Sequence, residues 1–230
     1  MADIRPNSEI ADGVHWIKGY SNCYIVEEGE DLILIDTEMN GKAEPILRYI
    51  HDELEDRRVV KVFLTHHHVD HVKGAPKIEE VYHPLFYAHK GDAAFILGEA
   101  KRPLPRNVLL KPLFFILDPF IRARPIESVE LIEDGQVVDG IQSIFLPGHT
   151  MGSMGFAKNG VMFSGDAVVT DRKGNPSLPL GLFTENMEMA RHSFKKLSTY
   201  DFDVLVCGHG PPILEDASIQ VKEAVDRLNL

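Results

Sequence analysis

The sequence contains the segment Thr65-His66-His67-His68-Val69-Asp70-His71, which is its most distinctive stretch. It places four imidazoles and one carboxylate within seven residues, directly after the β-branched run 59–64. Neutral imidazole and carboxylate are the usual ligands of zinc, and of iron or manganese ions of similar size. Packing of a hydrophobic core gives no reason to gather so many polar side chains. The segment therefore predicts a metal site at the end of a strand, against the alternative of a solvated histidine cluster.

Three further ligand-type residues stand singly, each beside a glycine where an apolar run ends. They are His149 after Leu146-Pro147-Gly148, Asp166 after Met162-Phe163-Ser164-Gly165, and His209 after Val206-Cys207-Gly208. This arrangement is expected when loops at one edge of a sheet converge. Together with the first segment, these residues predict one composite site.

The spacing of the histidines in the first segment predicts different roles for them. His66 and His68 are two residues apart, so in an extended segment their side chains project to the same side while His67 points away. The pair can bind one ion together, and His67 is expected to have a supporting or structural role.

The whole set of motifs resembles the metallo-β-lactamase fold superfamily. Its HxHxDH signature matches His66, His68, Asp70 and His71, and four more segments follow the family's order along nearly the whole chain. These are Leu34–Thr37, Pro147–Thr150, Ser164–Asp166 and Gly208–Gly210. The resemblance implies a mixed α/β (α+β) fold, a four-layer αββα sandwich with its site at one sheet edge.

The resemblance also implies the roles of the site residues. It assigns the first metal to His66, His68 and His149, the second metal to Asp70, His71 and His209, and the bridge between them to Asp166. A carboxylate can span two cations with its two oxygens, which supports that bridge. The implied cofactors are two divalent ions, zinc first, with iron or manganese open. Asp70 is given a second, catalytic role, and Asp36 and Thr37 are expected to support the histidines.

Two cations at about 3.5 to 4 Å can share a water and lower its pKa toward roughly 7. The expected reaction is hydrolysis of a small acyl substrate by metal-bound hydroxide, with Asp70 orienting the hydroxide or relaying its proton. The sequence has no GxSxG nucleophile elbow and no GxxxxGK phosphate loop. Similarity to the glyoxalase II-like branch favours a thioester first and a lactone second. The leaving group stays open, because glyoxalase II proper has a carboxy-terminal glutathione-binding region, whereas this chain ends about 20 residues after His209.

Several alternatives within the same fold remain. A metal-dependent nuclease or phosphodiesterase shares the two-metal ligands, but a net charge of −11 disfavours nucleic acid as a partner. A mono-iron sulfur dioxygenase is similar in sequence. A non-catalytic metal-binding sensor is disfavoured by the complete ligand set. The presence of Asp166, with no cysteine suitably placed, disfavours lactam hydrolysis.

Composition predicts one domain over residues 1–230. The chain is 44% hydrophobic, and no stretch approaches the roughly 20 apolar residues that span a bilayer. The amino terminus MADIRPNSEI has no apolar core of a secretory signal, so we expect a cytoplasmic protein without a membrane partner. Its two cysteines, Cys23 and Cys207, are expected to be buried thiols.

Periodicity predicts the elements around the site. Strands are expected at 23–26, 32–35, 59–64, 81–88, within 129–146, and at 204–207. Helices with one apolar stripe are expected at 46–54, 187–197 and 221–228.

The segment from Gly91 to Pro125 is predicted to be an irregular insertion, because its five prolines forbid one long helix. Residues 93–125 have a net charge of +4, whereas the remainder has −15. Core packing, a substrate lid and a homodimer contact are all open. As a lid it would attract an anionic small-molecule substrate through Arg102 and Arg106.

Overall fold

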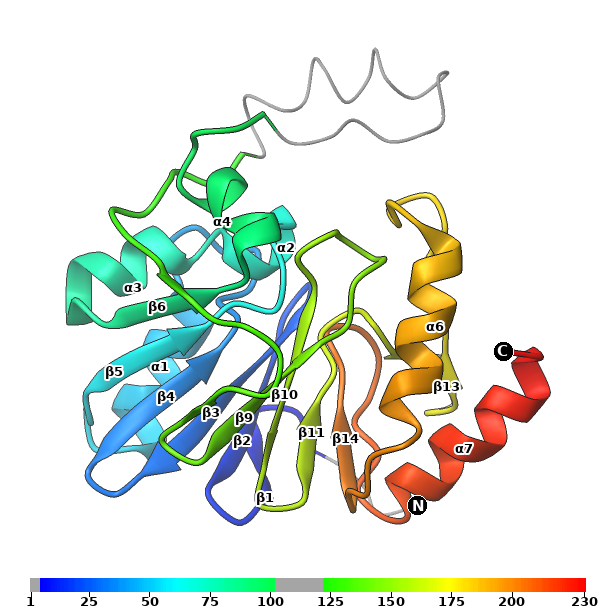
Figure 1. The fold of residues 1–230 in the computed structure, drawn as a ribbon. Coiled ribbons are helices and arrows are strands. Elements are labelled where there is room, and N and C mark those ends of the chain that lie inside the picture. Colours follow the sequence, from blue (N-terminus) through cyan, green and yellow to red (C-terminus); the bar gives the residue numbers. More distant parts are fainter. Residues whose placement is uncertain (1–4, 102–121) are drawn as a thin grey trace.

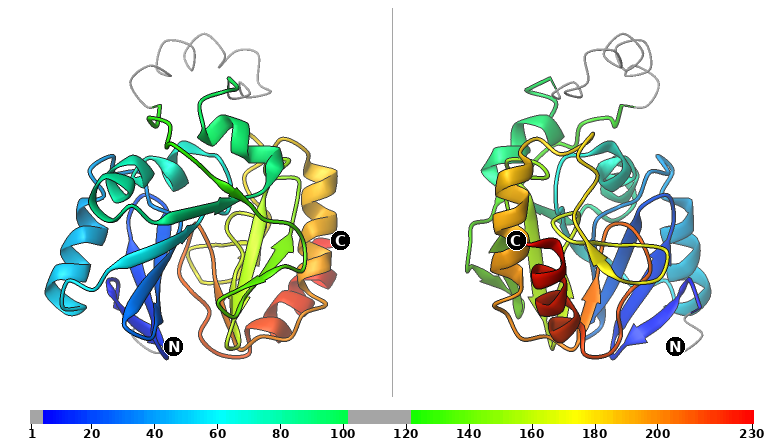
Figure 2. Two further views of the ribbon diagram at one scale, coloured as in Figure 1. Left: turned by 60° about the vertical axis from the view of Figure 1, so that its left-hand side comes forward. Right: turned by 90° about the vertical axis from the view of Figure 1, so that its right-hand side faces the viewer.

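The structure is a computed structural model, and it describes residues 5–101 and 122–230. Within these residues two β-sheets pack face to face, and helices cover the outer face of each sheet (Figure 1). Figure 2 shows the same layers from two further sides. The predicted four-layer α/β sandwich is therefore confirmed.

The first sheet has seven strands in sequence order, β1 to β7. The first four pair antiparallel, and β4 to β7 pair parallel. Their bounds are Ser8–Ala11, Val14–Lys18, Asn22–Glu28, Asp31–Ile35, Val59–Phe63, Leu85–Ala88 and Glu130–Leu131. The parallel strands need crossovers, and helices provide them. These helices are α1 (Glu44–Glu53), α2 (Val69–Val72), α3 (Ala75–Tyr82) and α4 (Lys90–Ile96).

The second sheet has five strands in the order β14-β11-β10-β9-β8. In sequence order they are β8 (Val137–Val138), β9 (Ile141–Phe145), β10 (Met154–Lys158), β11 (Val161–Phe163) and β14 (Val204–Val206). Two short strands, β12 (Val169–Thr170) and β13 (Pro176–Ser177), form a separate hairpin. The helices on this side are α6 (Met187–Leu197) and α7 (Ala217–Leu228).

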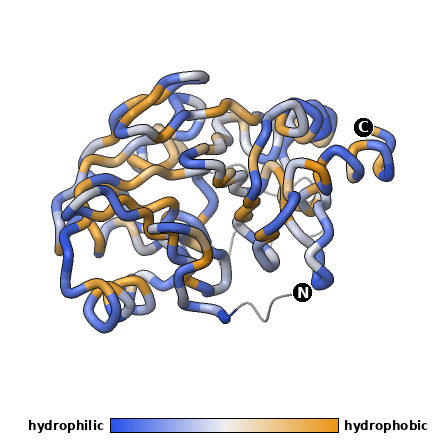
Figure 3. The backbone as a smooth tube through the Cα atoms, turned by 90° about the horizontal axis from the view of Figure 1, so that it is seen from below, coloured by the Kyte–Doolittle hydropathy of each residue, from blue (hydrophilic) through white to orange (hydrophobic). Residues whose placement is uncertain are grey.

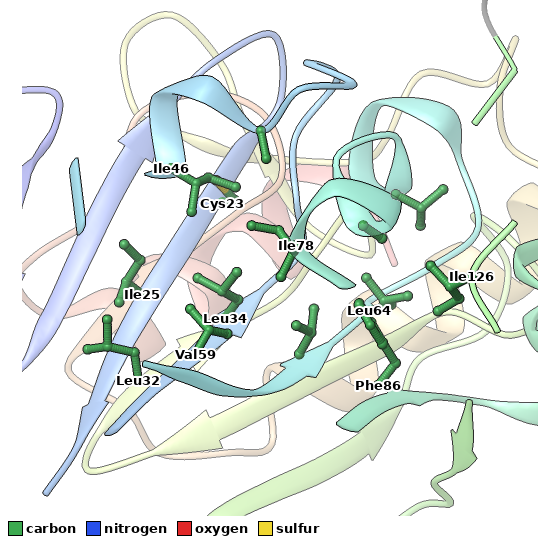
Figure 4. Packing of buried hydrophobic residues seen from close by; sticks show 14 of the residues in the cluster. Cys23, Ile25, Leu32, Leu34, Ile46, Val59, Leu64, Ile78, Phe86 and Ile126 are labelled. Carbon is green, nitrogen blue, oxygen red and sulfur yellow. The ribbon is translucent and has the colours of Figure 1, made fainter. Parts of the chain in front are cut away.

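Alternate side chains of β4 point to opposite faces of the sheet, which shows why the chain forms layers. Leu32 and Leu34 pack in the cluster beneath α1 and α3, whereas Ile33 and Ile35 pack against the second sheet. A strand buried on both faces is a continuous apolar run, as this one is. Figure 3 shows hydrophobic stretches, coloured orange, along the backbone, and Figure 4 shows the cluster beneath the helices.

The sheets meet in an aromatic core. Phe63 of β5 is fully buried, stacks on Tyr87 at 4.8 Å between ring centroids, and meets the edge of Phe156 of β10 at 5.1 Å. A third cluster lies beneath α6 and α7. Cys23 and Cys207 are buried free thiols, as predicted.

Strand direction brings the site segments to one edge. Parallel pairing places the carboxyl ends of β4 and β5 together in one sheet. In the other sheet, β11 pairs parallel with β14, and β9 runs in their direction because β10 is antiparallel to both β9 and β11. Every ligand-type residue singled out in the sequence follows one of these strands.

Two predicted boundaries are wrong. Val81 and Tyr82 end α3 rather than begin a strand, because the helix continues past the buried Ile78 and ends at the left-handed residue His83. Residues 91–96 are not irregular but belong to α4, where the Nδ1 of His89 accepts a hydrogen bond from the amide of Gly91 at 3.1 Å.

Most of the predicted insertion lies outside the described residues. This includes Arg102 and Arg106, on which the lid hypothesis depended. At the far end of the insertion, Ala123 is buried in the core beneath α3, so that end packs on the body of the protein. In the described ranges no helix has the length and apolar character needed to cross a membrane.

Candidate metal centre

The segments that follow the strands place seven ligand-type side chains in one cluster. His66 and His68 come from the turn after β5, and Asp70 and His71 from α2. The other three are His149 after β9, Asp166 after β11 and His209 after β14. Within the described residues, three subsets have ligand atoms that all lie within 4.8 Å of one another. They are His66-His68-His149, His66-His71-Asp166 and Asp70-His71-His209.

The group formed by His66, His68 and His149 is largely enclosed, because His66 and His149 are buried and His68 is half-buried. The Nε2 of His149 lies 2.9 Å from the Nδ1 of His68, and the ring of His66 lies 4.8 Å and 4.7 Å from the rings of His68 and His149. Burial lowers the pKa of His66 and His149 well below the ordinary value and lowers the pKa of His68 to about 3. The three imidazoles are therefore neutral, which is the form that binds a metal.

The group formed by Asp70, His71 and His209 is more open. The Nε2 of His209 lies 3.1 Å from Asp70 Oδ2, and the Nε2 of His71 lies 3.9 Å from the same oxygen. The side chain of His209 is 34% exposed, whereas that of His71 is fully buried. Solvent therefore contacts this group at His209 and, to a smaller extent, at Asp70.

Asp166 lies between the two groups. Its Oδ2 is 3.4 Å from His149 Nε2 and 3.5 Å from His209 Nε2, and its Oδ1 is 3.6 Å from His71 Nε2. Burial raises the pKa of this carboxyl and outweighs the lowering by His71 and His209. One carboxylate thus faces ligand atoms of both groups.

The donors of this cluster fit divalent metal ions. Among the described residues, His66 Nε2, His71 Nε2 and Asp166 Oδ1 are buried without a hydrogen-bond partner. Such orphaned polar atoms are costly unless a ligand satisfies them, and three of them converge here. Nitrogen and carboxylate oxygen donors suit zinc, iron and manganese alike.

Asp36 supports the group of Asp70, His71 and His209 through hydrogen bonds. Its Oδ2 accepts hydrogen bonds from His71 Nδ1 and Thr65 Oγ1, each at 2.7 Å, and its Oδ1 accepts one from the Thr65 amide at 2.8 Å. The hydroxyl of Thr37 donates to the His71 carbonyl at 2.9 Å. The expected contact of Asp36 and Thr37 with the histidines is present. Although burial lowers the pKa of His71, the carboxylates of Asp36, Asp166 and Asp70 raise it to about 10, so a metal ion must displace that proton.

Asp92 of α4 is a buried residue near the cluster that the sequence motifs did not indicate. Its side chain is buried and accepts a hydrogen bond from the backbone amide of His67 at 2.8 Å. His67 points away from the cluster, as predicted, and its Nδ1 lies 3.1 Å from Asp92 Oδ2. The signal was available, because Asp92 follows an apolar strand and stands beside Gly91, as the other ligand-type residues stand beside glycines. The remaining histidines belong to none of the three subsets; they are His15, His51, His83, His89 and His192.

Comparison with known families gives a match over most of the chain. Residues 16–209 match the sequence model of the metallo-beta-lactamase superfamily. A probable metallo-hydrolase, YflN of Bacillus subtilis, is 29% identical over 228 residues, which cover 89% of this chain and 86% of that protein. A hydroxyacylglutathione hydrolase of Vibrio cholerae is 29% identical over 197 residues, which cover 86% of this chain but 61% of that enzyme.

Solved structures agree with this fold. A metallo-beta-lactamase family protein of Thermus thermophilus, TTHA1429, superposes with a TM-score of 0.70 at 21% identity, over 96% of this chain and 81% of that one. The protein TTHA1623, solved in a di-iron-bound form, superposes with a TM-score of 0.64 at 25% identity, over 85% of this chain and 91% of that one.

Proposed function

This chain belongs to the metallo-beta-lactamase superfamily, and one of its relatives is named as a probable metallo-hydrolase. We propose that the chain is a dinuclear metallohydrolase of small acyl substrates, with a thioester as the first candidate. The observation that supports two ions rather than one is the position of Asp166, whose carboxylate faces His149 on one side and His209 on the other. A carboxylate placed between two sets of nitrogen donors is the arrangement that a bridging ligand requires.

In this proposal His66, His68 and His149 bind the first ion, Asp70, His71 and His209 bind the second, and Asp166 bridges them. Two divalent ions bound there would acidify a shared water and polarise the acyl carbonyl. Asp70 would orient that water or accept its proton. Its carboxylate is suited to orienting the water, because the charges of His71 and His209 lower its pKa despite burial and keep it ionised.

The thioester is favoured by one relative's activity. The Vibrio cholerae relative is named for hydrolysis of hydroxyacylglutathione, a thioester, although this chain spans only 61% of its length. The proposal therefore covers the acyl group and the reaction type and leaves the thiol portion open. The proposal also includes an anionic portion of the substrate, which the positive charges of Arg102 and Arg106 would attract. Both arginines lie outside the described ranges.

The test is steady-state hydrolysis of a lactoyl thioester by protein reconstituted separately with zinc, iron and manganese. We expect metal-dependent turnover with kcat/KM of about 10⁴ M⁻¹s⁻¹ or more, together with two bound ions per chain by elemental analysis. Two bound ions without thioester turnover would contradict the thioester assignment, and the same preparations would then be assayed with a lactone and a phosphodiester.

A further inference from the structure

The carboxylate of Asp92 joins two segments that are far apart in sequence. Its Oδ2 accepts hydrogen bonds from the His67 amide at 2.8 Å and from the Thr150 hydroxyl at 2.7 Å. Its Oδ1 accepts a hydrogen bond from the Gly152 amide at 2.9 Å. Asp92 is 1% exposed, so water does not compete for these bonds, and each is made to a charged acceptor.

The backbone around Asp92 is in equally close contact with the same turn. A Cβ added at Gly91 would lie 2.9 Å from the Cα of Gly152, and one added at Gly152 would lie 2.5 Å from both the amide nitrogen and Oδ1 of Asp92. Both positions therefore require glycine because of the close approach. The first turn of α4 packs directly on the turn that follows His149.

One turn further along α4, Phe95 packs on His67. The two ring centroids are 4.5 Å apart at an interplanar angle of 30°. Helix α4 thus holds His67 through Asp92 and Phe95, and it holds Thr150 and Gly152 through Asp92. His67 lies between the ligand-type residues His66 and His68, and Thr150 directly follows His149.

The two candidate metal groups differ in what supports them. Asp36 bonds directly to His71, which belongs to the group with Asp70 and His209. Asp92 bonds to the neighbours of His66, His68 and His149 and to no ligand-type residue of the other group in the hydrogen bonds described. Asp36 also reaches the first group through Thr65, whose hydroxyl donates to Asp36 and lies 2.9 Å from His66 Nδ1. Asp92, in contrast, joins the turn of His66 and His68 to the turn of His149 and, among the described residues, is bonded to the turns of the first group alone.

We propose that Asp92 is the positioning residue of the first metal group, because it fixes the turn of His66 and His68 relative to the turn of His149. This inference rests on the proposed function, since it assumes that this group binds a metal ion. Its consequence is selective: loss of the Asp92 carboxylate weakens metal binding at the first group more than at the second.

The test is titration of the metal-free full-length protein with Zn²⁺ in competition with a chromophoric chelator. His149→Ala and His209→Ala identify which binding step belongs to which group. For Asp92→Asn we expect the step lost in His149→Ala to weaken by about 10- to 100-fold, the range typical for residues that orient metal ligands. The step lost in His209→Ala is expected to change by less than about threefold.

Thr150→Val is a milder variant that removes one hydroxyl and keeps the bonds of Asp92 to His67 and Gly152. It is expected to weaken the same step in the same direction by a smaller factor, and it carries the test if Asp92→Asn does not fold by circular dichroism. Asp134→Asn is the control, because Asp134 accepts a hydrogen bond from the Phe145 amide at 2.7 Å outside the candidate site. We expect it to leave both steps unchanged.

The outcomes separate this inference from the proposed function. Wild-type protein that binds fewer than two Zn²⁺ ions would contradict the dinuclear proposal itself. Suppose that wild-type protein shows two Zn²⁺-binding steps. If Asp92→Asn and Thr150→Val then change neither step, or weaken both steps equally, the positioning role of Asp92 is wrong and the dinuclear proposal stands.

Discussion

At the scale of single residues, Asp166 is the most stringent test of a two-ion site. Its carboxylate faces His149, His71 and His209, so Asp166→Ala removes the one group that can join both sets of donors. We expect this variant to retain at most one metal ion and to lose most hydrolytic activity, by about 100-fold or more. Elemental analysis and steady-state assays measure the two effects. Two ions retained in Asp166→Ala would rule out the bridging role.

Gly148 shows how the backbone positions a ligand-type residue. Its φ is +132°, and an added Cβ would lie 2.2 Å from the amide nitrogen of Ala190 in α6. We expect Gly148→Ala to lower the free energy of unfolding by about 2 kcal/mol or more and to displace His149, which follows it. Urea unfolding and zinc affinity measure the two effects.

Gly29 provides the matched control for this prediction. Its φ is +58°, and an added Cβ would meet no atom within 4 Å. Gly29→Ala should therefore cost about 1 kcal/mol through backbone strain alone and leave zinc affinity intact. Equal effects of the two substitutions would show that the contact with α6 does not position His149.

The site could be located from the sequence at this scale because ligand-type residues beside glycine, after apolar runs, are an unusual combination. The same sequence could not show the distances within the cluster, because these depend on how two sheets pack. Asp92 follows an apolar strand beside a glycine, so its position had a sequence signal, but its role did not. Its partners include the backbone amides of His67 and Gly152, and backbone donors leave no mark in a sequence pattern.

At the scale of elements, Glu27 joins three segments of the first sheet. Its carboxylate on β3 pairs with Arg57, which precedes β5, and accepts a hydrogen bond at 3.0 Å from the ring of His15 on β2. The Arg57 hydrogen bond is the largest influence that lowers the pKa of Glu27 from its ordinary 4.5. The carboxylate thus stabilises the fold in its ionised form.

The pH dependence of this contribution follows from the sign of the shift. A lowered pKa gives stability that is present above about pH 4.5 and is lost as the pH falls through the folded-state pKa. We expect Glu27→Gln to be less stable than wild type at pH 7, by up to about 1 kcal/mol because the side chain is partly exposed, and the difference to shrink on acidification. Urea unfolding between pH 3 and pH 7 measures this.

Glu44→Gln is the comparison for Glu27→Gln. Glu44 pairs with Arg48 at 3.2 Å on the exposed face of α1, where both side chains are more than half exposed. This substitution should change stability by less than about 0.5 kcal/mol across the same pH range. A Glu27→Gln difference that persists unchanged at pH 3 would contradict the ionic contribution.

Most elements were predictable because their burial is periodic. Each of these elements buries its apolar side chains at regular intervals, on one face or on both, and this spacing predicts the element. They are strands β3, β4 and β5 and helices α1, α6 and α7. The run 81–88 predicts a strand that begins at Val81, whereas the packing of the buried Ile78 extends α3 to Tyr82. Helix α4 was missed because it is short and because its packing on the turn after His149 is a tertiary contact without a local sequence signal.

At the scale of the whole molecule, the site exists only while the two sheets keep their relative position. The segments that hold His66, His68 and His71 follow a strand of the first sheet. The segments that hold His149, Asp166 and His209 follow strands of the second. The aromatic core between the sheets is therefore a structural support of the candidate metal centre. This dependence could not be predicted from sequence, because Phe63 and Phe156, which are far apart in the chain, meet only when the sheets pack.

The final prediction compares two buried phenylalanines in different layers. Phe156 lies between the sheets against Phe63, whereas Phe202 lies beneath the outer helices near the amino end of β14, away from the ligand edge. Each change to leucine should lower the free energy of unfolding of the metal-free protein by about 1–2 kcal/mol. Only Phe156→Leu should also weaken Zn²⁺ binding, because only that substitution alters how the sheets face each other. Urea unfolding and chelator competition measure both quantities, and equal loss of zinc affinity in the two variants would show that the site responds to overall stability rather than to the packing between the sheets.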